Sequence, residues 1–410
     1  MRVVSISPSS DLPSARSGHR IVTAGHSLVL FGGYTARDLS PNEQPRGELK
    51  RDLWSFNINS QQWAELKSNP DDYPLATASS AVIALKSKII VYGGSGPNFG
   101  FSNCGQLRIL DLTNLEWSVV DVQGDPIEAS YGHSISMSPD GSRLYMYGGT
   151  TGQMYFNTMH VIDTINWTNS SYLRSPTPGR YRSESIEHDG KIIIFGGGCP
   201  FAMEDLGTLP VFCTDTNTWS EITSPSSRVP AGRTAHSCTK VGSKVYVIGG
   251  EVTLHTTIIV DNDQRIPMPY KDASKEIWVF DLDTYTWSEL PQTLPTEIFF
   301  HSASLGPDGN IYVFGGSEYC SWKDQNGYTR KITKRTNKLF KLELEIPSLM
   351  ETAWDVLYDH HSDLDAEDFL TLGVPEFLVR RSFEFLETDE DEPMLEKTFQ
   401  EPTESGNIGP

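Results

Sequence analysis

The chain of 410 residues has few cysteines and no long hydrophobic run. No stretch reaches the roughly 18 apolar residues of a membrane-spanning helix, and residues 1–13 lack the apolar core of a signal peptide. The cysteines are scattered and form no CxxC pair, which supports neither a disulfide framework nor a zinc site and predicts a cytoplasmic or nuclear protein. They are Cys104, Cys199, Cys213, Cys238 and Cys320.

Positive charge is also scarce, since 33 basic residues face 53 acidic ones, for a net charge of −20. From residue 345 to the end there are 18 acidic and 3 basic residues, so −15 of this charge belongs to the C-terminal segment. A broad basic face for nucleic acid is therefore not expected.

Recognisable catalytic patterns are missing as well. No Cys–Tyr–His metal set and no Ser–His–Asp arrangement is legible, and the one adjacent histidine pair, His360-His361, lies in the acidic C-terminal segment. The sequence therefore predicts a protein that is not an enzyme and has no cofactor or metal.

The chain does contain six short apolar runs that each end in a pair of glycines. Such a run is typical of a strand buried on both faces, and the glycines permit positive φ where the strand leaves the core. The pairs are Gly32-Gly33, Gly93-Gly94, Gly148-Gly149, Gly196-Gly197, Gly249-Gly250 and Gly315-Gly316.

Each glycine pair sits in a repeat of four expected strands. A strand often led by histidine precedes the pair, and a variable loop, a further strand and usually a tryptophan strand follow it. A period of about fifty residues resembles the kelch repeat, which predicts an all-β, six-bladed kelch β-propeller over residues 1–345.

The sixth repeat has no tryptophan strand of its own. Residues 3–7 are strand-like and precede the first histidine-led strand, so we expect them to supply the outer strand of the sixth blade and to close the ring. Closure would remove free sheet edges. The alternative is a disordered N-terminus.

Residues 346–387 change pattern and predict a short helical segment. Pro347 lies in the first turn of one helix, Ser362 with Asp365 resembles a capping box for a second helix that Gly373 ends, and a third follows. Residues 388–410 are too highly charged to pack, which predicts a disordered acidic tail.

The first of these helices carries a recognisable motif. Ser348, Leu349, Ala353 and Leu357, with Trp354 beside them, resemble a BC box, the elongin C-binding helix of cullin-RING ubiquitin ligase receptors. Leu349 would insert into a pocket, while the small Ala353 would let the helix backbone approach its partner.

A second motif follows, in which Val374, Pro375 and Leu378 resemble a cullin-2 box. The sequence leaves an alternative open, in which the C-terminal helices cap the underside of the propeller by their apolar faces.

Several segments together resemble the kelch domain-containing protein 10 family, from about Ser14 to Phe385. The resemblance implies a substrate receptor in the ubiquitin-dependent degradation pathway, assembled with elongin B, elongin C and cullin-2. Its substrates would be protein C-termini ending in glycine or alanine, known as C-degrons. Cullin-5 in place of cullin-2 stays open, as does a kelch scaffold or actin-associated protein without ligase assembly. The segments are Gly148–Gly152, Arg180–Arg182, Gly196–Gly198, Phe299–His301 and Pro347–Trp354.

Residues just before the histidine-led strands are expected to line a central pocket. Arginine forks bind a carboxylate bidentately, and aromatic walls select a slim tail. Arg182 and then Arg180 are the first candidates, because two arginines stand there in place of the usual histidine. Alternatively, such arginines form inter-blade salt bridges with Glu184, Glu187 or Asp189, and the histidines are buried core groups. The predicted substrate-binding set is Arg182, Arg180, Arg16, Arg233, Tyr131, Phe300 and His301.

Overall fold

The regular structure of the computed structural model is almost entirely β-strand, and its described helical residues all lie between 353 and 379. Within the described part of the chain, no helix has the length and apolar character needed to cross a membrane. The structure describes residues 1–7, 11–36, 47–69, 73–74, 77–96, 101–172, 175–199, 202–261, 264–323, 329–344, 353–354, 357, 361, 364–376 and 379.

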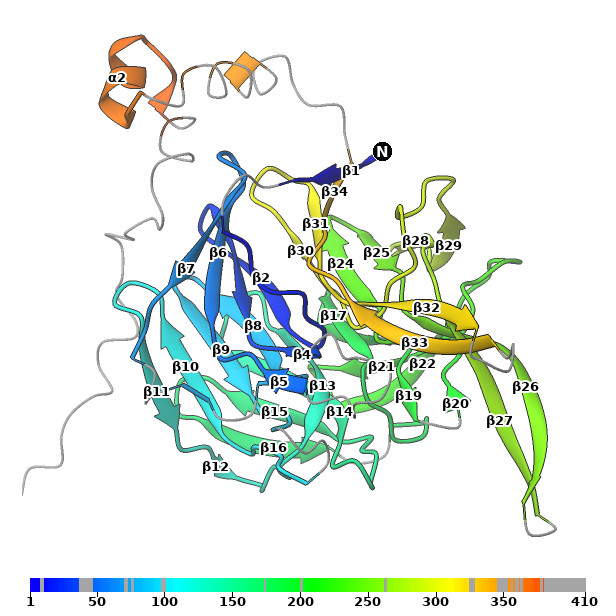
Figure 1. Cartoon of the computed structure of the whole chain (residues 1–410). Helices are drawn as coiled ribbons and strands as arrows, with labels where there is room; N and C mark the ends of the chain where they lie inside the picture. The colour runs from blue at the N-terminus through cyan, green and yellow to red at the C-terminus, as the bar shows by residue number, and fades with distance from the viewer. Residues whose placement is uncertain are drawn as a thin grey trace, which may run out of the picture.

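Six antiparallel sheets carry the fold, one for each repeat, and are named sheet 1 to sheet 6 in chain order (Figure 1). A fifth strand, β12 (Gln123–Gly124), adds to sheet 3 in parallel with its outer strand. The strands of sheets 1 to 3 are β2 (Arg20–Ala24), β3 (Ser27–Phe31), β6 (Leu53–Asn57) and β7 (Gln62–Leu66); β8 (Ala81–Leu85), β9 (Lys88–Tyr92), β10 (Leu107–Asp111) and β11 (Glu116–Val120); β13 (Tyr131–Met137), β14 (Arg143–Thr150), β15 (Met159–Asp163) and β16 (Thr168–Tyr172). Those of sheets 4 to 6 are β17 (Glu184–His188), β18 (Lys191–Phe195), β21 (Thr208–Cys213) and β22 (Thr218–Thr223); β24 (Ser237–Val241), β25 (Lys244–Ile248), β28 (Ile277–Asp281) and β29 (Thr286–Glu289); β30 (Ser302–Leu305), β31 (Ile311–Phe314), β34 (Leu339–Glu343) and β1 (Arg2–Ile6).

The second strand of each sheet is the apolar run that the glycine pairs predicted. Every residue of β3 and β31 is buried, and β9 and β18 are buried from their second residue onward. These strands read as continuous apolar runs because neighbouring sheets cover both of their faces.

The N-terminal strand β1 completes sheet 6, as the missing tryptophan strand predicted. It pairs antiparallel with β34, with Arg2 opposite Glu343 and Ile6 opposite Leu339. The outer edge of sheet 6 is therefore supplied by a segment more than three hundred residues away in the sequence.

The hydrophobic core lies between the sheets. Six apolar clusters fill the spaces between successive sheets, and one of them joins sheet 6 back to sheet 1. In that cluster the ring of Trp63 lies 5.0 Å from the ring of Phe314. The first strands also contact one another in the order β2, β8, β13, β17, β24, β30 and back to β2. This arrangement supports the expected β-propeller fold.

The glycine pairs of sheets 5 and 6 are each followed by a long hairpin. In sheet 5 the long excursion forms β26 (Glu251–Asp261) and β27 (Gln264–Ala273), which project away from the sheets, and sheet 6 adds β32 (Ser317–Lys323) and β33 (Thr329–Arg335) (Figure 1). The remaining short strands are β4 (Tyr34–Ala36), β5 (Gly47–Leu49), β19 (Gly198–Cys199), β20 (Ala202–Met203) and β23 (Arg233–Thr234).

The helix α2 (Ala366–Thr371) begins later than the predicted cap at Ser362, which lies outside the described residues. Its N-cap is Asp365, whose carboxylate accepts from the Asp368 N–H at 2.9 Å, and the Asp365 N–H donates to Asp368 at 3.1 Å. Two carboxylates thus satisfy the first free N–H groups, which explains the later start. Gly373, with φ 81°, follows the last turn.

Candidate functional site

A closed ring of six backbone hydrogen bonds lies where the first strands of the six sheets meet. Each sheet contributes the residue before its histidine position, and its N–H donates to the carbonyl of the counterpart in the preceding sheet, at 2.8–3.2 Å. All six have positive φ, between 53° and 76°. We name this feature the central ring; it consists of Gly18, Ser79, Gly132, Arg182, Ala235 and Phe300.

Arg182 and Phe300 carry the large side chains of the central ring. Arg182 is 3 % exposed, and its Nη2 donates to Ser79 Oγ, two positions away in the ring. Its guanidinium carbon lies 4.9 Å from the centre of the Phe300 ring. A methyl group at Gly18 would lie 3.0 Å from Arg182 Nη2, so glycine leaves room for the guanidinium. Arg182 therefore reaches across the ring from sheet 4.

The charge of Arg182 has no carboxylate partner among the described residues. Burial, and next the nearby charge of Arg20, lower its pKa to about 9. The adjacent acid, Glu184, accepts instead from Arg20 at 2.7 Å. The Nε of Arg182 also lacks a hydrogen-bond partner within the described part of the chain. A buried cation in this state favours binding of an anion, because burial without a counter-charge is costly.

A second arginine, Arg335 at the end of β33, lies beside the same ring. Its Nε donates to Ser17 Oγ at 3.4 Å, and its guanidinium carbon lies 5.3 Å from the ring centre of Tyr34. Burial lowers its pKa. In the part of the chain that the structure describes, no carboxylate pairs with it. Because Ser17 precedes Gly18, both arginines contact the same two-residue segment.

Aromatic side chains lie beside the central ring, since Tyr131, Tyr181 and Phe299 are chain neighbours of its residues. Tyr181 packs edge-on against Tyr131 at 6.4 Å and against Tyr155 at 5.7 Å, and Tyr319 stacks on Phe299 at 4.8 Å. Burial raises the pKa of all four tyrosines, so they stay neutral. We name this group the aromatic cluster; it consists of Tyr131, Tyr155, Tyr181, Phe299, Phe300 and Tyr319.

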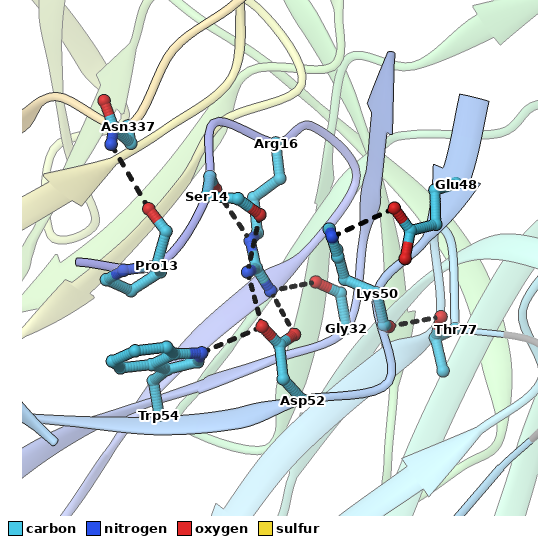
Figure 2. A network of polar contacts seen from close by, with 10 residues as sticks. All are labelled: Pro13, Ser14, Arg16, Gly32, Glu48, Lys50, Asp52, Trp54, Thr77 and Asn337. Carbon is cyan, nitrogen blue, oxygen red and sulfur yellow. Dashed lines mark hydrogen bonds and ion pairs between the residues drawn. The ribbon is translucent and has the colours of Figure 1, made fainter. Parts of the chain in front are cut away.

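Arg16, which the sequence also placed in the binding set, is bound within its own sheet (Figure 2). Its Nη1 and Nη2 donate to the two oxygens of Asp52 at 2.6 and 2.7 Å, and Nη1 also donates to the Gly32 carbonyl at 3.1 Å. The Asp52 carboxylate accepts a further bond from Trp54 Nε1 at 2.8 Å. The Arg16 side chain is 0 % exposed and has a full set of hydrogen-bond partners, so its role is structural.

Arg180 and Arg233 repeat this arrangement in sheets 4 and 5. Each Nη1 donates to the carbonyl of the first glycine of its own pair at 3.0 Å. Their Nη2 atoms lie 3.2 Å from Glu204 and 2.9 Å from Glu276. These arginines do form salt bridges, as the alternative proposed, but within one repeat and not between blades, and with Glu204 and Glu276 instead of Glu184, Glu187 or Asp189.

The assignment of both arginines of the fourth repeat to the histidine position was wrong. Ser183 occupies that position, since it contacts Gly197 as His19 contacts Gly33. Arg182 stands one residue before Ser183, in the central ring. Arg180 stands three residues before Ser183, at the position that corresponds to Arg16 and Arg233 in their own sheets.

His301 is a buried core group, as the alternative reading of the histidines proposed. It is 1 % exposed, and its Nε2 lies 3.0 Å from Ser237 Oγ. His19 and His133 make corresponding contacts with the Phe314 carbonyl and with Ser130 Oγ, at 3.0 and 3.1 Å. Within the described residues, no three His, Cys, Asp or Glu side chains are grouped to hold a metal ion.

The C-terminal motifs lie only partly within the described residues, because Ser348, Leu349 and Leu378 fall outside them. Trp354 is 2 % exposed and packs edge-on against Phe369 of α2 at 5.2 Å. Leu357 and Val374 pack against the same small cluster, whereas Ala353 and Pro375 are exposed. The described members of this cluster all come from residues 354–379.

Comparison with known proteins identifies the repeat. The family described as "KLHDC2/KLHL20/DRC7 Kelch-repeats domain" matches residues 18–250, and the Kelch motif matches residues 232–294. Kelch domain-containing protein 10 of Rattus norvegicus is 32% identical over 385 residues, which cover 90% of this chain and 86% of the relative. The Homo sapiens protein is 32% identical, with 80% of its length covered, and the Drosophila melanogaster homolog is 30% identical, with 62% of its length covered. The chain therefore belongs to the kelch domain-containing protein 10 family of kelch-repeat proteins.

Proposed function

We propose that this chain is the substrate-recognition subunit of a cullin-2–elongin B/C ubiquitin ligase. Its six sheets form the blades of a six-bladed propeller that binds protein C-termini ending in glycine or alanine at the central ring. The chain itself is a non-catalytic adaptor of the ligase.

The observation that carries this proposal is the pair of arginines at the central ring. Arg182 and Arg335 contact the same segment, and no described carboxylate neutralises either charge. A chain terminus supplies what they lack, since its carboxylate has two oxygens that accept from guanidinium groups. The aromatic cluster beside the central ring would exclude long side chains at the last position of the substrate.

The ligase part of the proposal depends on the C-terminal motifs. Trp354 and Leu357 of the BC-box motif pack with Val374 of the cullin-box motif around α2, so the two motifs belong to one small unit. The exposed Ala353 leaves the helix backbone accessible to a partner.

Fluorescence polarisation tests the recognition part. A labelled peptide ending in glycine should bind the full chain, and its C-terminal amide should bind at least tenfold more weakly. Loss of one charged hydrogen-bonding pair costs about 2 kcal/mol, so Arg182→Met should weaken binding roughly thirtyfold. The matched control is Arg228→Met, since this arginine is 76% exposed and pairs with Glu289 at the rim. Equal binding of acid and amide would refute recognition of the terminus.

Co-purification tests the assembly part separately. The wild-type chain should capture elongin B, elongin C and cullin-2, and Leu349→Arg should lose all three while still binding the glycine-ended peptide. A wild-type chain that captures none of them would refute the ligase role and leave terminus binding as an isolated activity.

A further inference from the structure

Sheet 3 lacks the buried arginine that sheets 1, 4 and 5 hold. In all six sheets the residue three positions before the histidine position accepts, through its carbonyl, a bond from the second glycine of the preceding sheet, at 2.8–3.1 Å. This bond establishes the equivalence of the six positions. They are Arg16, Thr77, Ser130, Arg180, Arg233 and Ile298.

The three arginines sit in the same kind of socket. Each Nε lies within bonding distance of the carbonyl two residues earlier, Nη1 bonds the first glycine of the pair, and Nη2 faces an acid. In sheets 1 and 5 that acid, Asp52 or Glu276, comes directly before the third strand. A socket in this fold is therefore defined by a carbonyl, a glycine and a carboxylate.

In sheet 3 the carbonyl and the glycine of the socket are present, but both the arginine and the acid before the third strand are replaced. Ser130 replaces the arginine, and its Oγ donates to the carbonyl of Glu128, two residues earlier, at 2.6 Å. Thr158 replaces the acid directly before the third strand. A cavity of about 400 Å³ remains there, and Ser130, Gly148 and Thr158 all line it. This volume is within the range of about 300–1,000 Å³ typical of ligand sites.

The cavity keeps a negative charge without the positive one. Asp125 and Glu128 line it from exposed positions, and among the described residues neither forms an ion pair. The two lining histidines add no positive charge at neutral pH, because burial lowers the pKa of His133 to about 3 and that of His160 to about 4. Phe156 also lines the cavity, and aromatic residues are among those on which guanidinium groups stack.

We propose that the cavity of sheet 3 is a binding site for the guanidinium group of an arginine side chain presented by a bound polypeptide. The guest would occupy the place that Arg16, Arg180 and Arg233 occupy in their own sheets. Asp125 and Glu128 would supply the carboxylates in place of Asp52 and Glu276. This proposal is independent of terminus recognition at the central ring.

The test compares two probes of the same shape. N-acetyl-arginine amide should bind the full chain in isothermal titration calorimetry, and N-acetyl-citrulline amide, which lacks the charge, should bind at least tenfold more weakly. Asp125→Asn with Glu128→Gln should weaken the arginine probe roughly tenfold. The matched control is Asp121→Asn, an exposed acid of the same loop outside the cavity, which should leave binding unchanged.

A filled-socket variant gives the second measurement. Ser130→Arg with Thr158→Glu restores the residues of sheet 5, so it should fold at least as stably as the wild type and lose the arginine probe. Equal binding of both probes, no binding of either, or undiminished binding to the folded filled variant would overturn the proposal. If that variant does not fold, Asp125→Asn with Glu128→Gln decides, and binding at wild-type strength there also overturns it.

Discussion

Two arginine–carboxylate ion pairs of the same length differ strongly in burial, so their removal tests the energetics of the buried arginine. Arg16 Nη1 lies 2.6 Å from Asp52, with side-chain exposures of 0% and 22%, whereas Arg228 Nη2 lies 2.6 Å from Glu289, with exposures of 76% and 34%. Asp52→Ala leaves a fully buried cation without its counter-charge, so it should lower the free energy of unfolding by about 3–5 kcal/mol. Glu289→Ala should cost about 0–1 kcal/mol.

Urea unfolding followed by tryptophan fluorescence measures both changes. The double variant Arg16→Met with Asp52→Ala should be more stable than Asp52→Ala alone, because it removes the uncompensated charge as well. Burial tends to raise the pKa of Asp52, but hydrogen bonds and the charge of Arg16 outweigh it and hold that pKa below its usual value. If Asp52→Ala costs no more than Glu289→Ala, the assignment of a structural role to the arginine sockets is wrong.

Two further perturbations test the fold. In the folded state the pKa values of His133 and His301 are about 3, whereas in the unfolded chain these histidines bind protons near pH 6.5. Their contribution to the free energy of unfolding is therefore complete above pH 6.5 and is lost progressively on acidification. At pH 5 the free energy of unfolding should be lower by about 2 kcal/mol for each histidine, and His301→Asn should make this pH dependence shallower. Equal urea midpoints at pH 7.5 and pH 5 would contradict this prediction. Deletion of residues 1–6 exposes the edge of β34 and should lower the melting temperature and cause association in light scattering, whereas Arg2→Ala keeps the backbone pairing and should do neither.

The fold followed from the sequence because its strongest signals are local. A glycine pair after an apolar run depends on residues adjacent in the chain, and all six repeats gave the correct second strand. The place of β1 followed from counting, since one repeat lacked an outer strand. The start of α2 did not follow, because Ser362–Asp365 and Asp365–Asp368 have the same spacing and only the structure distinguishes them.

The site was harder to predict because residue type does not separate a structural arginine from a free one. Arg16 and Arg233 stand three residues before a histidine, with the first glycine sixteen residues on, and Arg180 has the same distance to Gly196. That spacing is a signal in the sequence and would have set them apart from Arg182. Arg335 has no such signal, since its position depends on the register of β32 with β33 and on how that hairpin packs.

The pairing of β1 with β34 also determines when the fold can be completed during synthesis. Ribosomes add roughly 5–20 residues per second, so β1 is made about 20–70 seconds before Glu343, its last partner, leaves the ribosome. The bond from Gly18 to Phe300 in the central ring must wait almost as long. Throughout that interval the nascent chain carries an unpaired strand at its beginning and an incomplete circle of sheets behind it. Closure of the circle therefore joins a strand that is made early in synthesis to one that is made late, and it cannot occur before β34 has been made.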